Sequence, residues 1–192
     1  METAWMDKIE RVVISADEIA RRVRDLGREI AADYRGGAGR DPRRRPLLVV
    51  GILKGAMPFM ADLIRALDLA IEYDFMAVSS YGNGTSPGEV RILKDLDCAI
   101  GGRDVLLVED IVDTGHTLHH LLAGLSARGP ATLRVCTLLD KPHRREVEVT
   151  VDYVGFVLPE NLFVVGYGLD YAEVYRNLPF VAILKPECIR DG

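Results

Sequence analysis

One stretch of the chain, residues 104–118, restricts most strongly what the whole sequence can fold into. It opens with an apolar, β-branched run at residues 105–108, which is short enough to be a fully buried strand. A turn centred on Gly115 follows, and a leucine-rich helical segment comes after it. A strand that enters a helix through a glycine turn presents free backbone N–H groups at the positive end of the helix, and such a turn binds anions. The sequence therefore predicts an α/β fold with an anion site at the end of this strand.

Acidic side chains stand in the same stretch and narrow the choice of ligand. Glu109 and Asp110 follow the predicted strand, and Asp113 opens the turn, where Thr114 and Thr117 add hydroxyl groups. Carboxylates repel a phosphate unless a cation lies between them or they face hydroxyl groups instead. A phosphorylated sugar, with a phosphate at one end and a diol or Mg²⁺-bound group at the other, satisfies both halves of the stretch. No Walker lysine follows the glycine, so the turn is not a nucleoside-triphosphate loop.

Length and composition set the outer limits. With 192 residues the chain suits one domain with a sizeable core. Its net charge of -5 disfavours nucleic acid as the main partner. Three cysteines, an odd number without metal-like spacing, predict free thiols in a reducing cytosol. No apolar run is long enough to span a membrane and no signal-peptide core is visible, so we expect a cytoplasmic protein.

Strand and helix patterns alternate along the rest of the chain, which is typical of a mostly parallel sheet flanked by helices. A capping box, Ser15 to Glu18, starts the first helix, and an apolar patch just before it suggests an early edge strand. Further strands are expected at residues 46–53, 71–78, 90–92, 133–139 and 149–157. Helices are expected at residues 15–33, 57–67 and 116–127.

Two lysines, Lys54 and Lys141, stand where a predicted strand ends. Ligands in open parallel sheets bind at the carboxyl ends of strands, so both lysines are candidate ligand contacts, although a lysine at a strand end need have no function. The polar, glycine-rich residues 79–88 cannot pack a core; they form either a flexible linker or a catalytic lid. Phe163 lies in an apolar run, where a single phenylalanine is usually part of the core.

Five motifs carry a family resemblance. They are Leu53-Lys-Gly, Ser79-Ser-Tyr-Gly, Val108-Glu-Asp-Ile-Val-Asp-Thr-Gly, Leu139-Asp-Lys-Pro and Phe163-Val-Val-Gly-Tyr-Gly-Leu-Asp-Tyr. In order and spacing they resemble the hypoxanthine-guanine phosphoribosyltransferases, a branch of the type I phosphoribosyltransferases, over about residues 45–185. The last motif is typical of the 6-oxopurine branch rather than the orotate, uracil or adenine branches.

The resemblance implies a fold and a reaction. The fold is that of a type I phosphoribosyltransferase, one domain over residues 1–192 with a central, mostly parallel sheet between helices. A lid loop at about 79–89 and a small base-binding hood, mainly from about 142–192, complete it. A cis peptide bond is implied at Leu53–Lys54. The implied reaction transfers the 5-phosphoribosyl group from 5-phosphoribosyl 1-diphosphate to N9 of hypoxanthine or guanine, releasing pyrophosphate in purine salvage.

The resemblance also implies roles for single residues. Asp113 would be catalytic, placed near the purine N7. The phosphoribosyl-diphosphate contacts would be Leu53, Lys54, Gly55, Ser80, Tyr81, Glu109, Asp110, Asp113, Thr114, Gly115, His116, Thr117 and Arg176. The base contacts would be Lys141, Phe163, Val164 and Asp170. Mg²⁺, the implied cofactor, would be bound by Glu109, Asp110 and Asp170.

Three positions depart from the family pattern. His116 occupies a loop position that is often lysine, the loop at 34–45 is extended, and the approach to Phe163 is one residue longer than usual.

Two other functions remain open at this point: an enzyme that prefers xanthine, and a regulator that keeps the fold but binds RNA. The acidic balance and the intact set of Lys141, Phe163 and Asp170 disfavour the regulator. The family's members are usually dimers or tetramers, so the resemblance implies a homo-oligomer that binds small molecules and no membrane.

Overall fold

A computed structural model of the protein describes residues 6–35, 45–80, 90–159 and 162–189. A six-stranded sheet forms the centre of the molecule. Its strand order is β4-β3-β2-β5-β6-β7, and all neighbours are parallel except the edge pair β3 and β4. The strands are β2 (Leu47–Leu53), β3 (Ile71–Ser80), β4 (Val90–Lys94), β5 (Asp104–Val112), β6 (Thr132–Asp140) and β7 (Tyr153–Val157). The predicted mostly parallel sheet is confirmed.

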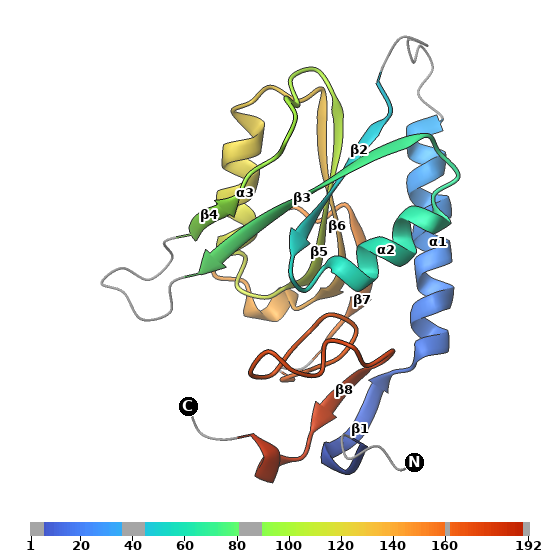
Figure 1. Cartoon of the computed structure of the whole chain (residues 1–192), viewed down its shortest axis with the longest axis vertical. Coiled ribbons are helices and arrows are strands. Elements are labelled where there is room, and N and C mark those ends of the chain that lie inside the picture. Colours follow the sequence, from blue (N-terminus) through green and yellow to red (C-terminus); the bar gives the residue numbers. More distant parts are fainter. Residues whose placement is uncertain (1–5, 36–44, 81–89, 160–161, 190–192) are drawn as a thin grey trace.

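Helices cover both faces of this sheet (Figure 1). Helices α1 (Ala16–Arg35) and α2 (Met57–Ala66) contribute to one hydrophobic cluster, and α3 (His116–Ser126) packs into a second one on the other face. The capping box starts α1 as predicted, since the Glu18 carboxylate accepts from the Ser15 N–H at 2.8 Å. Helices α1 and α2 pack closely because Gly27 has no side chain: a Cβ there would lie 2.6 Å from the Ala66 carbonyl oxygen.

Strand β5, which contains the apolar run at residues 105–108, lies between β2 and β6 in the middle of the sheet. Its residues 105–108 have no measurable exposure, as a strand covered on both faces requires. Because β2, β5, β6 and β7 are parallel, their carboxyl ends meet at one edge of the sheet. Polar residues that follow these strands are therefore brought together there.

A smaller unit lies beyond this edge (Figure 1). Strand β1 (Ile9–Ile14) pairs antiparallel with β8 (Val181–Leu184), so the two ends of the chain form one two-stranded sheet. The expected early edge strand is thereby confirmed. Between β7 and β8, the described residues of the chain run without regular strands or helices over residues 162–179. Short 3₁₀ turns stand at Met6–Lys8, Pro142–Arg144 and Pro186–Cys188.

One predicted strand is wrong in its first half. Residues 149–157 were expected to be extended throughout, but β7 begins at Tyr153. Val149 and Val151 pack against the α3 cluster, which produces the alternation that resembles a strand. The chain joins the sheet only at Asp152, whose carboxylate accepts from the Val135 N–H at 2.8 Å.

Three further predictions concern the cysteines, membrane-spanning helices and two loops. All three cysteines are free, as predicted. In the described part of the chain, no helix is long and apolar enough to cross a membrane. Most of the expected lid and of the extended loop at 34–45 lies outside the described residues.

Candidate active site at the carboxyl edge of the sheet

The turn after β5 has the shape predicted for an anion loop. Gly115 is the N-cap of α3 with a φ of 93°, a conformation that strongly favours glycine. A Cβ at this position would also lie 2.7 Å from the Val147 carbonyl oxygen. A cavity of about 120 Å³ opens beside the turn. It is lined by Glu109, Ile111, Val112, Asp113, Thr114, Gly115, Thr117 and Leu118.

The segment that follows β6 is hydrogen-bonded to the backbone of this loop. The N–H groups of Glu146 and Val147 donate to the Thr114 carbonyl oxygen at 3.0 and 3.2 Å. The Glu146 carboxylate lies 3.0 Å from His116 Nε2, at the first residue of α3. These contacts fix the backbone of the loop before any ligand arrives.

Of two neighbouring acids at the end of β5, Glu109 is buried and Asp110 is half-buried. Burial, and then the charge of Asp110, raise the pKa of Glu109 well above its usual range. The pKa of Asp110 is raised by burial, with Asp170 acting in the same direction, while the Ile111 N–H and the Arg176 guanidinium oppose the shift. A divalent cation would relieve this unfavourable accumulation of negative charge.

Close backbone approach brings a second loop against these acids. A Cβ on Gly55 would lie 1.7 Å from Asp110 Oδ2, so only glycine fits there. Gly168, with a φ of 103°, approaches from the other side, since its Cβ would lie 1.9 Å from the Gly55 carbonyl oxygen. The Leu53–Lys54 peptide bond is cis, as the resemblance implied.

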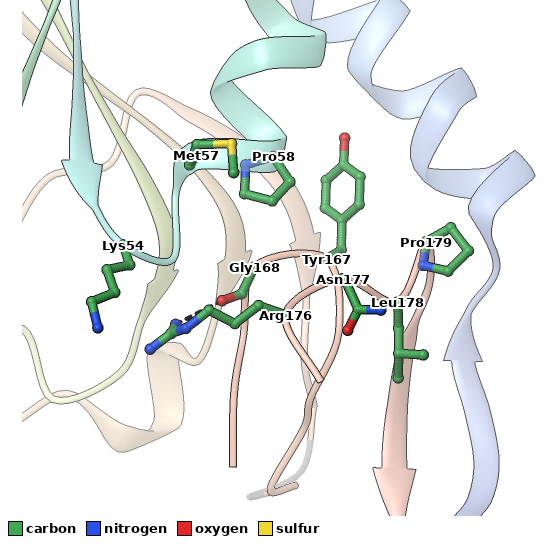
Figure 2. A pocket seen from close by; sticks show the side chains of 9 residues that line it. All are labelled: Lys54, Met57, Pro58, Tyr167, Gly168, Arg176, Asn177, Leu178 and Pro179. Atoms are coloured by element: carbon green, nitrogen blue, oxygen red, sulfur yellow. Dashed lines mark hydrogen bonds between the residues drawn. The ribbon is translucent and has the colours of Figure 1, made fainter. Parts of the chain in front are cut away.

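Two cations border this loop and share one carboxylate. Lys54 Nζ lies 2.7 Å from Glu173 Oε2, and this hydrogen bond lowers the pKa of Glu173. Arg176 forms an ion pair with Asp170 at 2.8 Å and approaches Glu173 Oε1 at 3.6 Å. Its other terminal nitrogen donates to the Gly168 carbonyl oxygen at 2.8 Å (Figure 2).

An apolar pocket of about 520 Å³ lies beside these two cations. Figure 2 shows that the start of α2 and the loop at residues 167–168 and 176–179 surround it. Its lining consists of Lys54, Met57, Pro58, Tyr167, Gly168, Arg176, Asn177, Leu178 and Pro179.

On the other side of the loop, Lys141 and Asp113 face each other. Lys141 follows β6, and its N–H donates to the Val112 carbonyl oxygen at 3.0 Å, which joins the ends of β5 and β6. Its side chain is only 7% exposed, and Nζ lies 3.5 Å from Asp113 Oδ2. A buried ammonium group that is not tightly paired is costly unless a ligand accepts its hydrogen bonds.

The aromatic residue of the last motif is not in the core. Phe163 is 49% exposed, and its ring meets that of Tyr171 edge to face with centroids 5.8 Å apart. The general expectation of a core phenylalanine is therefore wrong, and a ring surface is available for stacking. Val164, the next residue, is buried.

Some predicted site residues are not brought together. Among the described residues, no three His, Cys, Asp or Glu side chains converge as a metal cluster, so Glu109, Asp110 and Asp170 do not form a ready-made cage. Tyr81 lies outside the described residues, and the Ser80 side chain is not described.

Three further residues were not predicted. Glu173 joins the two cations, and Arg144 Nε lies 3.2 Å from Asp113 Oδ1. Arg145 donates to the carbonyl oxygens of Val112 and Asp113 and pairs with Asp140. The run of two arginines shortly after Lys141 was the available sequence signal for the last two.

Comparison with known proteins defines the class of this chain. Residues 15–172 match the family model of the phosphoribosyl transferase domain, and the chain belongs to this family. It is 50% identical to the hypoxanthine-guanine phosphoribosyltransferase of Bacillus subtilis over 93% of this chain and 94% of that protein. The crystal structure of a hypoxanthine phosphoribosyltransferase from Staphylococcus aureus superposes with a TM-score of 0.90, at 43% identity and over 100% of both chains.

A third relative is a much longer protein. The chain is 56% identical to the bifunctional protein TilS/HprT of Listeria monocytogenes over 93% of its own length, but it spans only 26% of that relative.

Proposed function

We propose that the protein transfers the 5-phosphoribosyl group of 5-phosphoribosyl 1-diphosphate to N9 of hypoxanthine or guanine, giving IMP or GMP and pyrophosphate. The observation that carries this proposal is a buried, loosely paired Lys141 beside Asp113, next to an anion loop at a helix N-terminus. The names of the relatives from Bacillus subtilis and Staphylococcus aureus support the same reaction.

The loop at residues 113–117 binds the 5′-phosphate in this proposal. Its backbone N–H groups at the start of α3 and the hydroxyl groups of Thr114 and Thr117 are the donors. Glu109 and Asp110 face the ribose hydroxyl groups from the wall of the same region, where an acceptor is needed and a phosphate would be repelled.

The opposite side of the site accepts the leaving pyrophosphate. Lys54 and Arg176 neutralise the charge that develops on it as the bond to the ribose breaks. The backbone around Leu53 and Gly55 adds contacts, and Ser80 and Tyr81 complete the set by the resemblance alone. Both cations already contact Glu173, whose carboxylate pyrophosphate replaces when it binds.

The base binds between Lys141 and Phe163. Lys141 can only donate hydrogen bonds, so it selects an acceptor at the purine 6-position. Phe163 offers its exposed ring for stacking, and the Val164 backbone and Asp170 contact the far edge of the base. Asp113 lies where it can accept a proton from N7 or orient the ring.

The acids fit Mg²⁺ bound together with substrate. Glu109 is buried and Asp110 is half-buried, and the pKa values of both are raised, which a cation would relieve. Asp170 is close enough to raise the pKa of Asp110. Mg²⁺ usually binds through one or two carboxylates, waters and substrate oxygens, which explains why no closed cage is needed. When bound it supplies positive charge to the pyrophosphate. We expect activity to disappear in excess EDTA and to return with Mg²⁺, whereas the melting temperature of the free protein barely changes.

We also infer, from the resemblance, that the chain assembles as a homodimer or homotetramer and acts in the cytoplasm. Sedimentation of the purified protein tests the oligomeric state. The three free thiols support a reducing compartment such as the cytoplasm.

Initial rates with four bases at saturating phosphoribosyl diphosphate and Mg²⁺ test the proposal. Hypoxanthine and guanine should react, and adenine should react at least about a thousandfold more slowly, because its 6-amino group meets Lys141 donor to donor. Xanthine carries the 6-oxygen, so its rate measures discrimination at the 2-position instead. Comparable rates with adenine and hypoxanthine would show that Lys141 does not read the base.

A further inference from the structure

We propose that Arg144 is a positioning residue that acts through Asp113: it holds one carboxylate oxygen so that the other stays available to the base. This inference rests on the proposed function and concerns a residue outside the five motifs. Arg144 Nε lies 3.2 Å from Asp113 Oδ1, while Lys141 Nζ lies 3.5 Å from Asp113 Oδ2. Each oxygen therefore faces its own cation.

The backbone around Arg144 is held firmly enough to direct its side chain. Arg144 ends the 3₁₀ turn Pro142–Arg144, and its N–H donates to the Lys141 carbonyl oxygen at 3.0 Å. The next residue, Arg145, is anchored on the carbonyl oxygens of Val112 and Asp113. The arginine and the carboxylate that it contacts are thus mounted on two segments that are tied to each other.

The pair has little value for folding, because both partners are open to solvent. The Arg144 side chain is 42% exposed and that of Asp113 is 40% exposed. Exposed pairs of this kind contribute little to stability. The pair does fix the orientation of the Asp113 carboxylate, since the terminal torsion of an aspartate is broad and two-fold unless a partner restricts it.

The contact between Lys141 and Asp113 is long for a charged hydrogen bond. A strong hydrogen bond between an ammonium group and a carboxylate measures about 2.7–2.9 Å, shorter than the 3.5 Å between Nζ and Oδ2. With Oδ1 held by Arg144, Asp113 does not close on Lys141, and both groups keep hydrogen-bonding capacity for the base. Without Arg144, the carboxylate is free to rotate onto Lys141 and both groups are withdrawn together.

Kinetics of Arg144→Ala with hypoxanthine and phosphoribosyl diphosphate test this role. We expect kcat/KM for hypoxanthine to fall about 10–100-fold, as a misplaced reacting group can cost about a hundredfold. KM for phosphoribosyl diphosphate should stay within about twofold, because the N–H and hydroxyl donors of the phosphate loop and Lys54 are not in contact with Arg144. Arg144→Lys, which keeps the charge, should recover part of the loss. Arg128→Ala, which removes a surface pair with Asp95 away from the site, is the matched control.

A double-mutant cycle with Asp113→Asn separates positioning from a general effect. If Arg144 acts through the carboxylate, Arg144→Ala should cost less than about threefold in the Asp113→Asn background. An equal loss in both backgrounds, or an unchanged kcat/KM in the single mutant, would overturn the inference while an active wild type leaves the proposed function standing. A wild type without hypoxanthine transfer would overturn both.

Discussion

The two sides of the candidate site are built in opposite ways. On the side of the anion loop, the functional groups follow buried parallel strands, and both Glu109 and Lys141 are buried. On the side of Lys54 and Arg176, the side chains of Lys54 and Glu173 are 69% and 66% exposed and lie on loops. Groups on the anion-loop side are thus held by the sheet, whereas Lys54 and Glu173 are held by loop backbone and by an exposed ion pair.

Backbone conformation sharpens this contrast. Within residues 166–175, four residues other than glycine have positive φ: Tyr167, Ala172, Glu173 and Tyr175. Such residues cost of order 1–3 kcal/mol each and persist only when their surroundings hold them. The Tyr167 hydroxyl group donates to Asp62 on α2 at 2.6 Å, and the Tyr167 N–H donates to the Leu178 carbonyl oxygen at 2.8 Å. Residues with a strained positive φ cluster at functional sites. In this segment they place Glu173 beside Lys54 and Arg176.

Removing the carboxylate of Asp113 should have the largest effect, because the proposed function places it beside the reacting base. We expect Asp113→Asn to lower kcat by about 10²–10⁴-fold, the range for a positioned acid or base, with no loss of melting temperature. Asp25→Asn, at an exposed surface pair on α1, is the control. A near-normal kcat in steady-state assays would remove Asp113 from the chemistry.

Changing Lys141 to glutamine should alter selectivity more than folding. An amide both donates and accepts, so the mutant should narrow the gap between hypoxanthine and adenine. Loss of a hydrogen bond to a charged donor costs about 1.5–3 kcal/mol, so the hypoxanthine rate should fall about 10–100-fold. The measurement is kcat/KM for both bases; an unchanged ratio would mean that another group reads the 6-position.

The sequence predicted features that depend on residues close together in the chain, and it missed those that depend on contacts between distant residues. The buried strand, the glycine turn and the capping box are local, and local patterns predicted them. The extra half-strand at 149–152 was predicted because alternating valines look alike whether they pair in a sheet or pack against α3. The contact of Glu173 with Lys54 spans 119 residues and depends on positive φ at residues other than glycine, which no periodicity indicates.

Burial of the Glu109 carboxyl group should lower the stability of the folded protein at neutral pH. A raised pKa means that folded Glu109 keeps its proton to higher pH than the unfolded chain does. The contribution of this bound proton to the stability of the folded protein is therefore complete below the ordinary pKa of 4.5. It is lost as pH rises through the raised pKa. Glu109→Gln should raise the melting temperature by about 2–4 °C at neutral pH without divalent cations, if it relieves about 1 kcal/mol.

Calorimetry of that variant from pH 4 to pH 8 checks the sign. The gain should shrink toward zero below pH of about 4.5, where wild-type Glu109 is also protonated in both states. Glu148→Gln, at an exposed position three residues after Arg145, should show no such trend. A lower melting temperature for Glu109→Gln at neutral pH would show that a partner stabilises the charged form.

The smallest effect is expected on the exposed side of the site, at Glu173. Its carboxylate occupies Lys54 and Arg176, the two cations that the proposed function assigns to pyrophosphate, so it competes with the substrate for them. Because an exposed ion pair is weak, Glu173→Gln should lower KM for phosphoribosyl diphosphate only about two- to fivefold at low salt, with kcat unchanged. The difference should fade at high ionic strength, where screening weakens the wild-type pair as well. Glu187→Gln, at an exposed position near the end of the described chain, serves as the control. A higher KM in Glu173→Gln would mean that this carboxylate helps to bind the substrate, and the two sides of the site would then be equally committed to it.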